Sequence, residues 1–276
     1  MSRLLAIPKA IVGTLNNKAI QVQMRTTSWL VVGAFLYQLS TIVLPQRVAF
    51  LLTFTALSIQ LVPTILVAAG LLPNESLKDV APGKTAALLP NTNGSKGTPS
   101  GRGFALLIIG IRISHPLGLF APGAKETGDY FTSLVALLES KKAELGYLGG
   151  NFIQSSDSSN SLSLIGYFDS MASLHNFAHG AEHRDAWNWW NKNVKSFPHL
   201  GVYHEAYDIP AHHWEAIYLQ TPKMGLGATE VAVGEGEEKK LVSVLEDARK
   251  GIWRTSRGRM GRGEKGISET DPYVSE

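Results

Sequence analysis

The sequence predicts an α+β protein in which a ferredoxin-like antiparallel sheet follows two transmembrane helices. Two long uncharged, apolar runs precede Glu75, whereas strand-like and helix-like patterns alternate after residue 104 in the order β-α-β-β-α-β, with one extra strand. A single sheet of this kind leaves one face open. We therefore expect two copies to pair face to face as a dimeric α+β barrel.

The composition excludes several kinds of chemistry. The chain has 276 residues and no cysteine, which rules out disulfides, thiolate metal sites and cysteine nucleophiles. Only 18% of its residues are charged, below the usual quarter, as expected if part of the chain lies in a membrane. The basic run near the C-terminus has no aromatic interleaving of the kind that marks a nucleic-acid binder, so no nucleic-acid partner is expected.

Residues 28–72 are expected to form a two-span transmembrane hairpin. The uncharged runs 26–46 and 48–74 are separated by Arg47 alone. Each run reaches the roughly 20 residues that a helix needs to cross a bilayer core. A buried helical hairpin of a soluble protein is the alternative. A signal peptide fits less well, because its apolar region spans only about 7–15 residues.

The flanking charges predict an orientation. Residues 1–27 form a basic N-terminus that contains four cations and no acid, so the positive-inside rule keeps it in the cytosol. Two crossings return the chain to the same side. We expect a multi-pass membrane protein, in the endoplasmic reticulum, with a cytosolic C-terminal domain.

Two segments have the composition of unpacked chain. Residues 73–103 contain four prolines and five glycines without periodicity, which is typical of a flexible linker. Residues 228–276 are expected to form a charged, partly disordered tail, with one short helix over 237–250 followed by a basic run. We expect this tail to be solvated, with contact to anionic lipid headgroups as the alternative.

Residues 104–227 have the periodicities of a folded domain. Residues 104–113 form a continuous apolar, β-branched run that predicts a buried strand. Helical spacing follows over 123–146 and again over 170–195, where Gly180 is expected to interrupt the helix. The remaining strands are expected at 151–156, 161–169, 199–210 and 212–222.

The helix around residue 183 carries the densest cluster of polar and aromatic side chains. At 100° per residue, one narrow stripe contains His179, His183, Trp187, Trp190 and Val194. A neutral imidazole can accept a proton, and an indole N–H can donate to an oxygen atom. Arg184, nearby on the helix, could hold an anion. The alternatives are a core helix whose aromatic residues fill space, or a metal held by histidines four residues apart, although no carboxylate takes the position that a zinc-protease motif requires.

The strand over 199–210 has two different faces. With a period of two, one face carries Tyr203, Glu205 and Tyr207, and the other carries Val202, His204 and Ala206. Either His204 or Glu205 can therefore point into a barrel, and the buried one is a candidate base.

An arginine on the first strand also needs an explanation. Arg112 shares a face with otherwise apolar residues, so it needs an acidic partner, and Glu205 or Glu215 could supply one. Both a structural ion pair and a substrate clamp remain open.

Three segments of the domain resemble a known family. GIRISHPLGLF, AEHRDAWNWWNKNV and HLGVYHEAYDIPAHHWEAIYLQTPKMGLG are similar to the antibiotic-biosynthesis-monooxygenase (ABM)-like proteins, in the fungal branch that includes a monooxygenase of the fumagillin pathway. The resemblance covers about residues 104–227. It implies a dimeric ferredoxin-like domain and a monooxygenase that acts on a lipophilic polyketide or terpenoid intermediate of fungal secondary metabolism.

The resemblance also singles out residues without assigning their roles. By position, the candidate catalytic residues are His183, Arg184, Trp187, His204, Glu205 and Tyr207. The candidate substrate-binding residues are Arg112, Trp190 and Tyr203. The expected partners are the substrate, molecular oxygen, a membrane and a second copy of the chain, and no metal ligands are assigned.

The cofactor depends on the substrate. A cofactor-free oxygenase needs a substrate with an acidic proton, for which His183 or His204 would be the base, with Arg184 and the Trp187 N–H stabilising the oxyanion. A plain polyene has no such proton and would need haem or non-haem iron with a histidine ligand. The alternatives are a haem-dependent lyase of the aldoxime-dehydratase kind and a non-catalytic, membrane-tethered binding protein.

Overall fold

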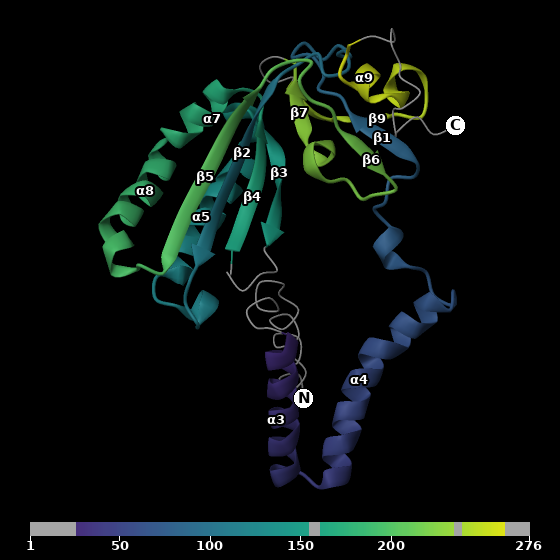
Figure 1. Cartoon of the computed structure of the whole chain (residues 1–276), viewed down its shortest axis with the longest axis vertical. Coiled ribbons are helices and arrows are strands. Elements are labelled where there is room, and N and C mark those ends of the chain that lie inside the picture. The colour runs from purple at the N-terminus through teal and green to yellow at the C-terminus, as the bar shows by residue number, and fades with distance from the viewer. Residues whose placement is uncertain (1–25, 155–160, 235–238, 263–276) are drawn as a thin grey trace. The chain divides into compact units, whose positions relative to one another are not determined.

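The computed structural model describes residues 26–154, 161–234 and 239–262, which divide between two compact units (Figure 1). The first unit ends at Lys78, and the second begins at Asp79. The predicted basic N-terminus lies almost entirely outside the described residues.

The first unit contains two apolar helices, α3 (Thr26–Val43) and α4 (Gln46–Ala68), followed by the short helix η1 (Glu75–Leu77). Within the described part of the chain, α4 alone has the length and hydropathy to cross a membrane. Pro45 caps α4 and cannot continue the preceding helix, so α3 ends earlier than the uncharged run that predicted it. The structure therefore supplies one candidate span and does not confirm the expected pair.

The second unit is built on a four-stranded antiparallel sheet with the strand order β3-β4-β2-β5. Its strands are β2 (Phe104–Ile113), β3 (Tyr147–Gln154), β4 (Ser161–Phe168) and β5 (Leu200–Ile209). This is the order of a ferredoxin-like sheet, and it confirms the predicted α+β class. The turn expected between β3 and β4 lies outside the described residues.

The helices α5, α7 and α8 cover one face of this sheet (Figure 1). The helical segments are η2 (Gly118–Phe120), α5 (Ala124–Ser140), α6 (Lys142–Leu145), α7 (Met171–Ala178), α8 (Ala181–Asn193) and η3 (Val194–Ser196). Gly180 has an extended backbone between α7 and α8, which confirms the predicted interruption. The core on this side includes Leu138 from α5, together with Phe168 and Phe177.

The pairing of β2 with β5 decides which side chains of β5 face the helices. Ile109 packs into the helix-side core and lies opposite His204. Ile108 is opposite Glu205, so Glu205 points to the other face of the sheet.

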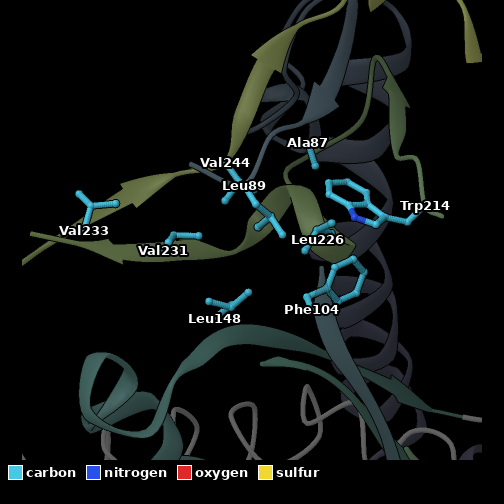
Figure 2. Close-up of a cluster of buried hydrophobic side chains, with 9 residues drawn as sticks. All are labelled: Ala87, Leu89, Phe104, Leu148, Trp214, Leu226, Val231, Val233 and Val244. Carbon is cyan, nitrogen blue, oxygen red and sulfur yellow. The ribbon is translucent and has the colours of Figure 1, made fainter. Parts of the chain in front are cut away.

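Two smaller sheets pack on part of that other face. One has the order β6-β1-β9, and the other pairs β7 with β8. Their strands are β1 (Lys84–Ala87), β6 (Ile217–Leu219), β7 (Glu230–Val233), β8 (Lys240–Ser243) and β9 (Leu245–Asp247). The remaining short helices are η4 (Gly225–Ala228), η6 (Gly251–Arg254) and α9 (Ser256–Arg259). A shared core joins these sheets to the main one, with the rings of Phe104 and Trp214 5.4 Å apart (Figure 2).

The structure corrects the expected linker at 73–103. Strand β1 pairs with both β6 and β9, and Leu88 and Leu89 are buried. The indole of Trp214 donates to the carbonyl of Arg102 at 2.8 Å. The prolines and glycines of this segment led to the prediction of unpacked chain. Its strand pairs with distant parts of the chain, so no local pattern indicated it.

The described parts of the expected C-terminal tail, residues 228–234 and 239–262, are also folded. Residues 240–243 and 245–247, predicted to be helical, are strands β8 and β9. The side chain of Arg259 is only 1% exposed and binds Glu215 at 2.9 Å. This buried ion pair fixes the basic run to the domain, whereas residues 263–276 lie outside the described part.

Candidate functional site

A cavity of about 200 Å³ lies between the helices and the sheet. Its walls come from β2, β4, β5, α5, α7 and α8 and are mostly aliphatic or aromatic. Apart from the indole of Trp187, its polar side chains are three imidazoles, those of His175, His183 and His204. An apolar chamber with a few convergent polar groups is the usual form of a small-molecule site.

A smaller cavity of about 90 Å³ adjoins the first one. His183 and Trp187 line both cavities, and Tyr130, Trp189 and Trp190 belong to the smaller one alone. The predicted stripe of α8 therefore does face a hollow rather than solid packing. The hollow, however, lies on the helix side of the sheet, and not on the open face where a second copy was expected to close it.

His183 is the best-placed base in the cavity. It lies in the first turn of α8, is half-buried, and its ring meets that of Phe177 edge to face at 5.7 Å. Burial is the main cause that lowers the pKa of His183, and the neighbouring His204 and His179 lower the pKa further, against a hydrogen bond to the backbone of Ala178. The neutral imidazole, which can accept a proton, is therefore favoured.

His204 approaches the same cavity from the sheet. Its strand, β5, is an edge strand, and its side chain is exposed at the margin of the cavity. The sequence left open whether His204 or Glu205 points inward, and the register selects His204. Two imidazoles thus reach one apolar chamber from opposite walls.

Trp187 lies one turn after His183 on α8 and is 54% exposed. Since it lines both cavities and still contacts solvent, it lies at their common margin. Trp190, a predicted substrate contact, is half-buried and also packs beside Ala121 and Leu200. Part of the Trp190 side chain therefore packs in the core and does not face the cavity.

The other predicted catalytic residues do not join this site. Arg184 is exposed and lines neither cavity. Glu205 and Tyr207 lie on the opposite face of the sheet, where the Tyr207 hydroxyl donates to Glu205 at 2.5 Å. That hydrogen bond is the main cause that raises the pKa of Tyr207. The six candidates therefore split between the two faces.

Tyr203 and Arg112 also belong to the opposite face. Tyr203 lies across Gly110, where an added Cβ would be 2.6 Å from its ring, and its hydroxyl is 2.6 Å from that of Ser163. Arg112 is exposed, and neither acid proposed for it forms an ion pair with it: Glu215 binds Arg259, and Glu205 accepts from Tyr207. These two residues therefore do not reach the cavity as substrate contacts.

The sequence interpretation missed some lining residues. His175 lies eight residues before His183 but across the interruption at Gly180, so no single helical stripe connects them. Tyr130 and Phe131 come from α5, where the spacing of Tyr130 with three leucines was used only to predict the helix. The aromatic character of these two residues was the signal available.

The donor set limits the metals that could bind here. Among the described residues, no three or more His, Asp or Glu side chains gather as a metal site. The lining offers imidazoles but no carboxylate, which does not fit the two-histidine, one-carboxylate set of non-haem iron. One imidazole would suffice as an axial ligand of haem, so the donor set of this cavity does not oppose the haem-dependent alternative.

Fold and site together define an α+β protein of the ferredoxin-like type with a histidine-bearing apolar cavity under its helices. Residues 104–226 match the family model described as monooxygenase af470-like. A relative named monooxygenase af470, from Aspergillus fumigatus, is 30% identical over 246 residues, which cover 87% of this chain and 88% of the relative. The chain belongs to the monooxygenase af470-like family.

Two of the solved structures to which this chain is similar cover about half of it or less. An aldoxime dehydratase in complex with butyraldoxime is 14% identical, with a TM-score of 0.38 over 52% of this chain and 42% of that one. SnoaB, a cofactor-independent oxygenase from Streptomyces nogalater, is 10% identical, with a TM-score of 0.27 over 37% of this chain and 90% of that one.

Proposed function

We propose that this protein is a membrane-anchored monooxygenase that acts on a lipophilic polyketide or terpenoid intermediate of fungal secondary metabolism. The observation that carries the proposal is the convergence of His183 and His204 on a cavity with otherwise apolar and aromatic walls. Such a chamber would bind a lipophilic substrate and place a base beside it.

The proposed base is the neutral imidazole of His183. Because the pKa of this group is lowered by burial, its proton-accepting form predominates at neutral pH. The reaction needs a substrate whose C–H bond is acidified by neighbouring carbonyl or aromatic groups. Removing that proton leaves a carbanion that can reduce molecular oxygen.

The atoms balance without an external reductant. The carbanion transfers an electron to oxygen, and the two radicals combine to form a C–O bond. The resulting peroxide anion takes a proton to become a hydroperoxide. Loss of a second C–H proton breaks the O–O bond, so that a CH₂ group and O₂ yield a carbonyl group and water.

The developing anion would be stabilised by groups at the cavity margin. The N–H of Trp187 can donate to oxygen, and the imidazolium formed on His183 supplies a positive charge and returns the proton. His204 would stabilise the same anion from the sheet side. Arg184, expected in this role from the sequence, is too exposed to serve it in this chain.

The membrane part of the proposal rests on α4, whose length and composition suit a bilayer span. We retain the expectation of a multi-pass anchor in the endoplasmic reticulum with the catalytic domain in the cytosol. A second copy would cover the part of the open sheet face where Tyr203 and Tyr207 remain 43% and 46% exposed.

The test begins with the missing substrate. Deleting the gene and identifying the lipophilic intermediate that accumulates supplies the compound, and oxygen uptake by the purified full chain then measures turnover. His183→Ala should lower the rate by about 10²–10⁴-fold, the usual contribution of a general base. Arg184→Ala, on the neighbouring residue, should leave the rate unchanged.

Three results would contradict the proposal. Full turnover by His183→Ala would show that His183 is not the base. Absent oxygen uptake by the wild-type chain would favour a non-catalytic binding protein. A Soret band in the absorption spectrum, with loss of turnover on removing the pigment, would favour the haem-dependent alternative.

A further inference from the structure

The loop that joins β2 to α5 presents large apolar side chains to solvent. Residues 114–123, which we call the β2–α5 loop, include η2 at their centre. Phe120 is 75% exposed and Leu117 is 57% exposed. In the described part of the second unit, nothing covers the ring of Phe120 or the side chain of Leu117. No step of the proposed reaction uses either residue.

This exposure is held in place by the surrounding structure. The amide of Ser114 donates to the carbonyl of His199 at 2.7 Å, and the imidazole of His199 lies 2.9 Å from the carbonyl of Pro122. Ala121 is buried in a cluster with Leu200. Both ends of the loop are therefore fixed, and Phe120 projects from a rigid turn.

Basic side chains lie on the segments that lead into this loop or contact it. Arg112, Lys192 and Lys195 are all exposed, and none takes part in the ion pairs found among the described residues. The segment that follows α8 contacts the loop, because the ring of Phe197 packs against Gly123. The apolar projection thus has a positively charged border.

The acidic residues at this end do not cancel that charge. Glu126 and Asp129 lie in the first turns of α5, and Asp129 is held by Lys125 at 2.5 Å. An apolar tip can enter the acyl-chain region of a bilayer, and the cations around it can bind anionic headgroups.

The loop also adjoins the smaller cavity. Trp190 lines that cavity and belongs to the same packed cluster as Ala121. A molecule dissolved in lipid would therefore have a short path from the loop to the chamber.

We propose that the β2–α5 loop is a membrane-contact surface of the second unit. Leu117 and Phe120 enter the boundary between headgroups and acyl chains, while Lys192 and Lys195 bind anionic headgroups. The delivery of a lipophilic substrate through this contact rests on the proposed function, whereas the contact itself does not.

The absence of cysteine allows a direct test in the full chain. A single cysteine, Pro116→Cys, keeps both apolar side chains and carries an environment-sensitive NBD label. The labelled chain is reconstituted into vesicles of phosphatidylcholine with 30 mol% phosphatidylserine, in which nitroxide lipids quench a label that enters the bilayer. Leu241→Cys on β8, with 46% exposure, is the matched aqueous control, and Ile59→Cys in α4 reports the anchor.

The expected result is quenching at position 116 and none at position 241. Adding Phe120→Ser should lower the docking equilibrium on the order of tenfold, from the lost burial of one aromatic side chain. Adding Lys192→Gln and Lys195→Gln should lower it about fivefold for each lysine, and only when phosphatidylserine is present.

Two results would overturn the proposal. The first is an unquenched label at position 116, in which case the loop stays in water. The second is an unquenched but blue-shifted label that cross-links between chains, which assigns the loop to a contact with a second copy. Since position 59 reports α4 separately, failure of the loop is distinguished from failure of the proposed anchor.

Discussion

Replacing Arg259 by methionine should strongly destabilise the second unit. Its side chain is 1% exposed and Glu215 is 25% exposed, with 2.9 Å between them, and Arg259 also donates to the carbonyl of Trp253 at 2.9 Å. Removing one partner of a buried ion pair costs about 3–5 kcal/mol. Because water reaches part of Glu215, we expect about 3 kcal/mol, near the lower end of that range.

For a domain of this size, about 3 kcal/mol corresponds to a melting temperature lower by roughly 6–12 °C. The assay is thermal unfolding of the full chain in detergent, followed by tryptophan fluorescence, since five of the six tryptophans lie in the second unit. Arg249→Gln is the matched control. It breaks an arginine–carboxylate pair of similar length whose members are 63% and 50% exposed, and it should melt within about 1 °C of the parent.

A second variant separates charge from packing. Combining Arg259→Met with Glu215→Leu removes both charges, so it should recover much of the lost stability. If Arg259→Met alone melts like the parent, the buried Arg259–Glu215 pair does not fix the basic C-terminal segment to the domain.

Three further predictions concern the cavity, the sheet and the joined core. His204→Gln should raise the pKa of His183, because it removes a neighbour whose positive charge lowers that pKa. NMR titration of the imidazoles measures the pKa of His183, and an unchanged value would mean that the two imidazoles do not interact. Since the folded pKa of His183 lies below the unfolded value of about 6.5, the fold loses stability as pH falls below about 6.5, and His204→Gln should reduce that loss. Gly110→Ala should cost about 1–3 kcal/mol in chemical unfolding because the ring of Tyr203 occupies the space of the new methyl group, and the cost should vanish in a Tyr203→Ala background; a cost that persists there has another cause. Trp214→Phe should cost about 1–3 kcal/mol in the same assay because it leaves a backbone carbonyl without its 2.8 Å donor, and an unchanged midpoint would mean that water replaces the indole.

The sequence was sufficient where structure is encoded locally. The apolar run at residues 104–113 is strand β2, and the helical spacing that follows it is helix α5. The interruption at Gly180 and the common stripe of His183 and Trp187 were also predictable, because helix geometry alone relates positions one turn apart.

The faces of β5 could not be assigned from the sequence. A period of two separates His204 from Glu205 but does not say which of them meets the helices. That choice depends on the register with β2, and one step of slip would exchange them. Glu205 and Tyr207, which the family resemblance singled out by position, lie on the face of the sheet away from the cavity.

The smaller sheets could not be predicted from local sequence patterns. Strands β1 and β9 are short, and each is defined by a partner far along the chain. Their glycine-rich and proline-rich surroundings have the composition of unpacked chain, and pairing that crosses more than a hundred residues leaves no periodic trace.

The order of these strands has a consequence for biosynthesis. The middle strand of its sheet, β1, is translated early, yet one neighbour ends at Leu219 and the other at Asp247. A ribosome must therefore pass residue 247 of 276 before the segment that follows the apolar helices can close its own sheet. A chain that stops prematurely would leave the backbone N–H and C=O groups of β1 unpaired. Cellular quality control could recognise the truncated chain by this unpaired strand edge.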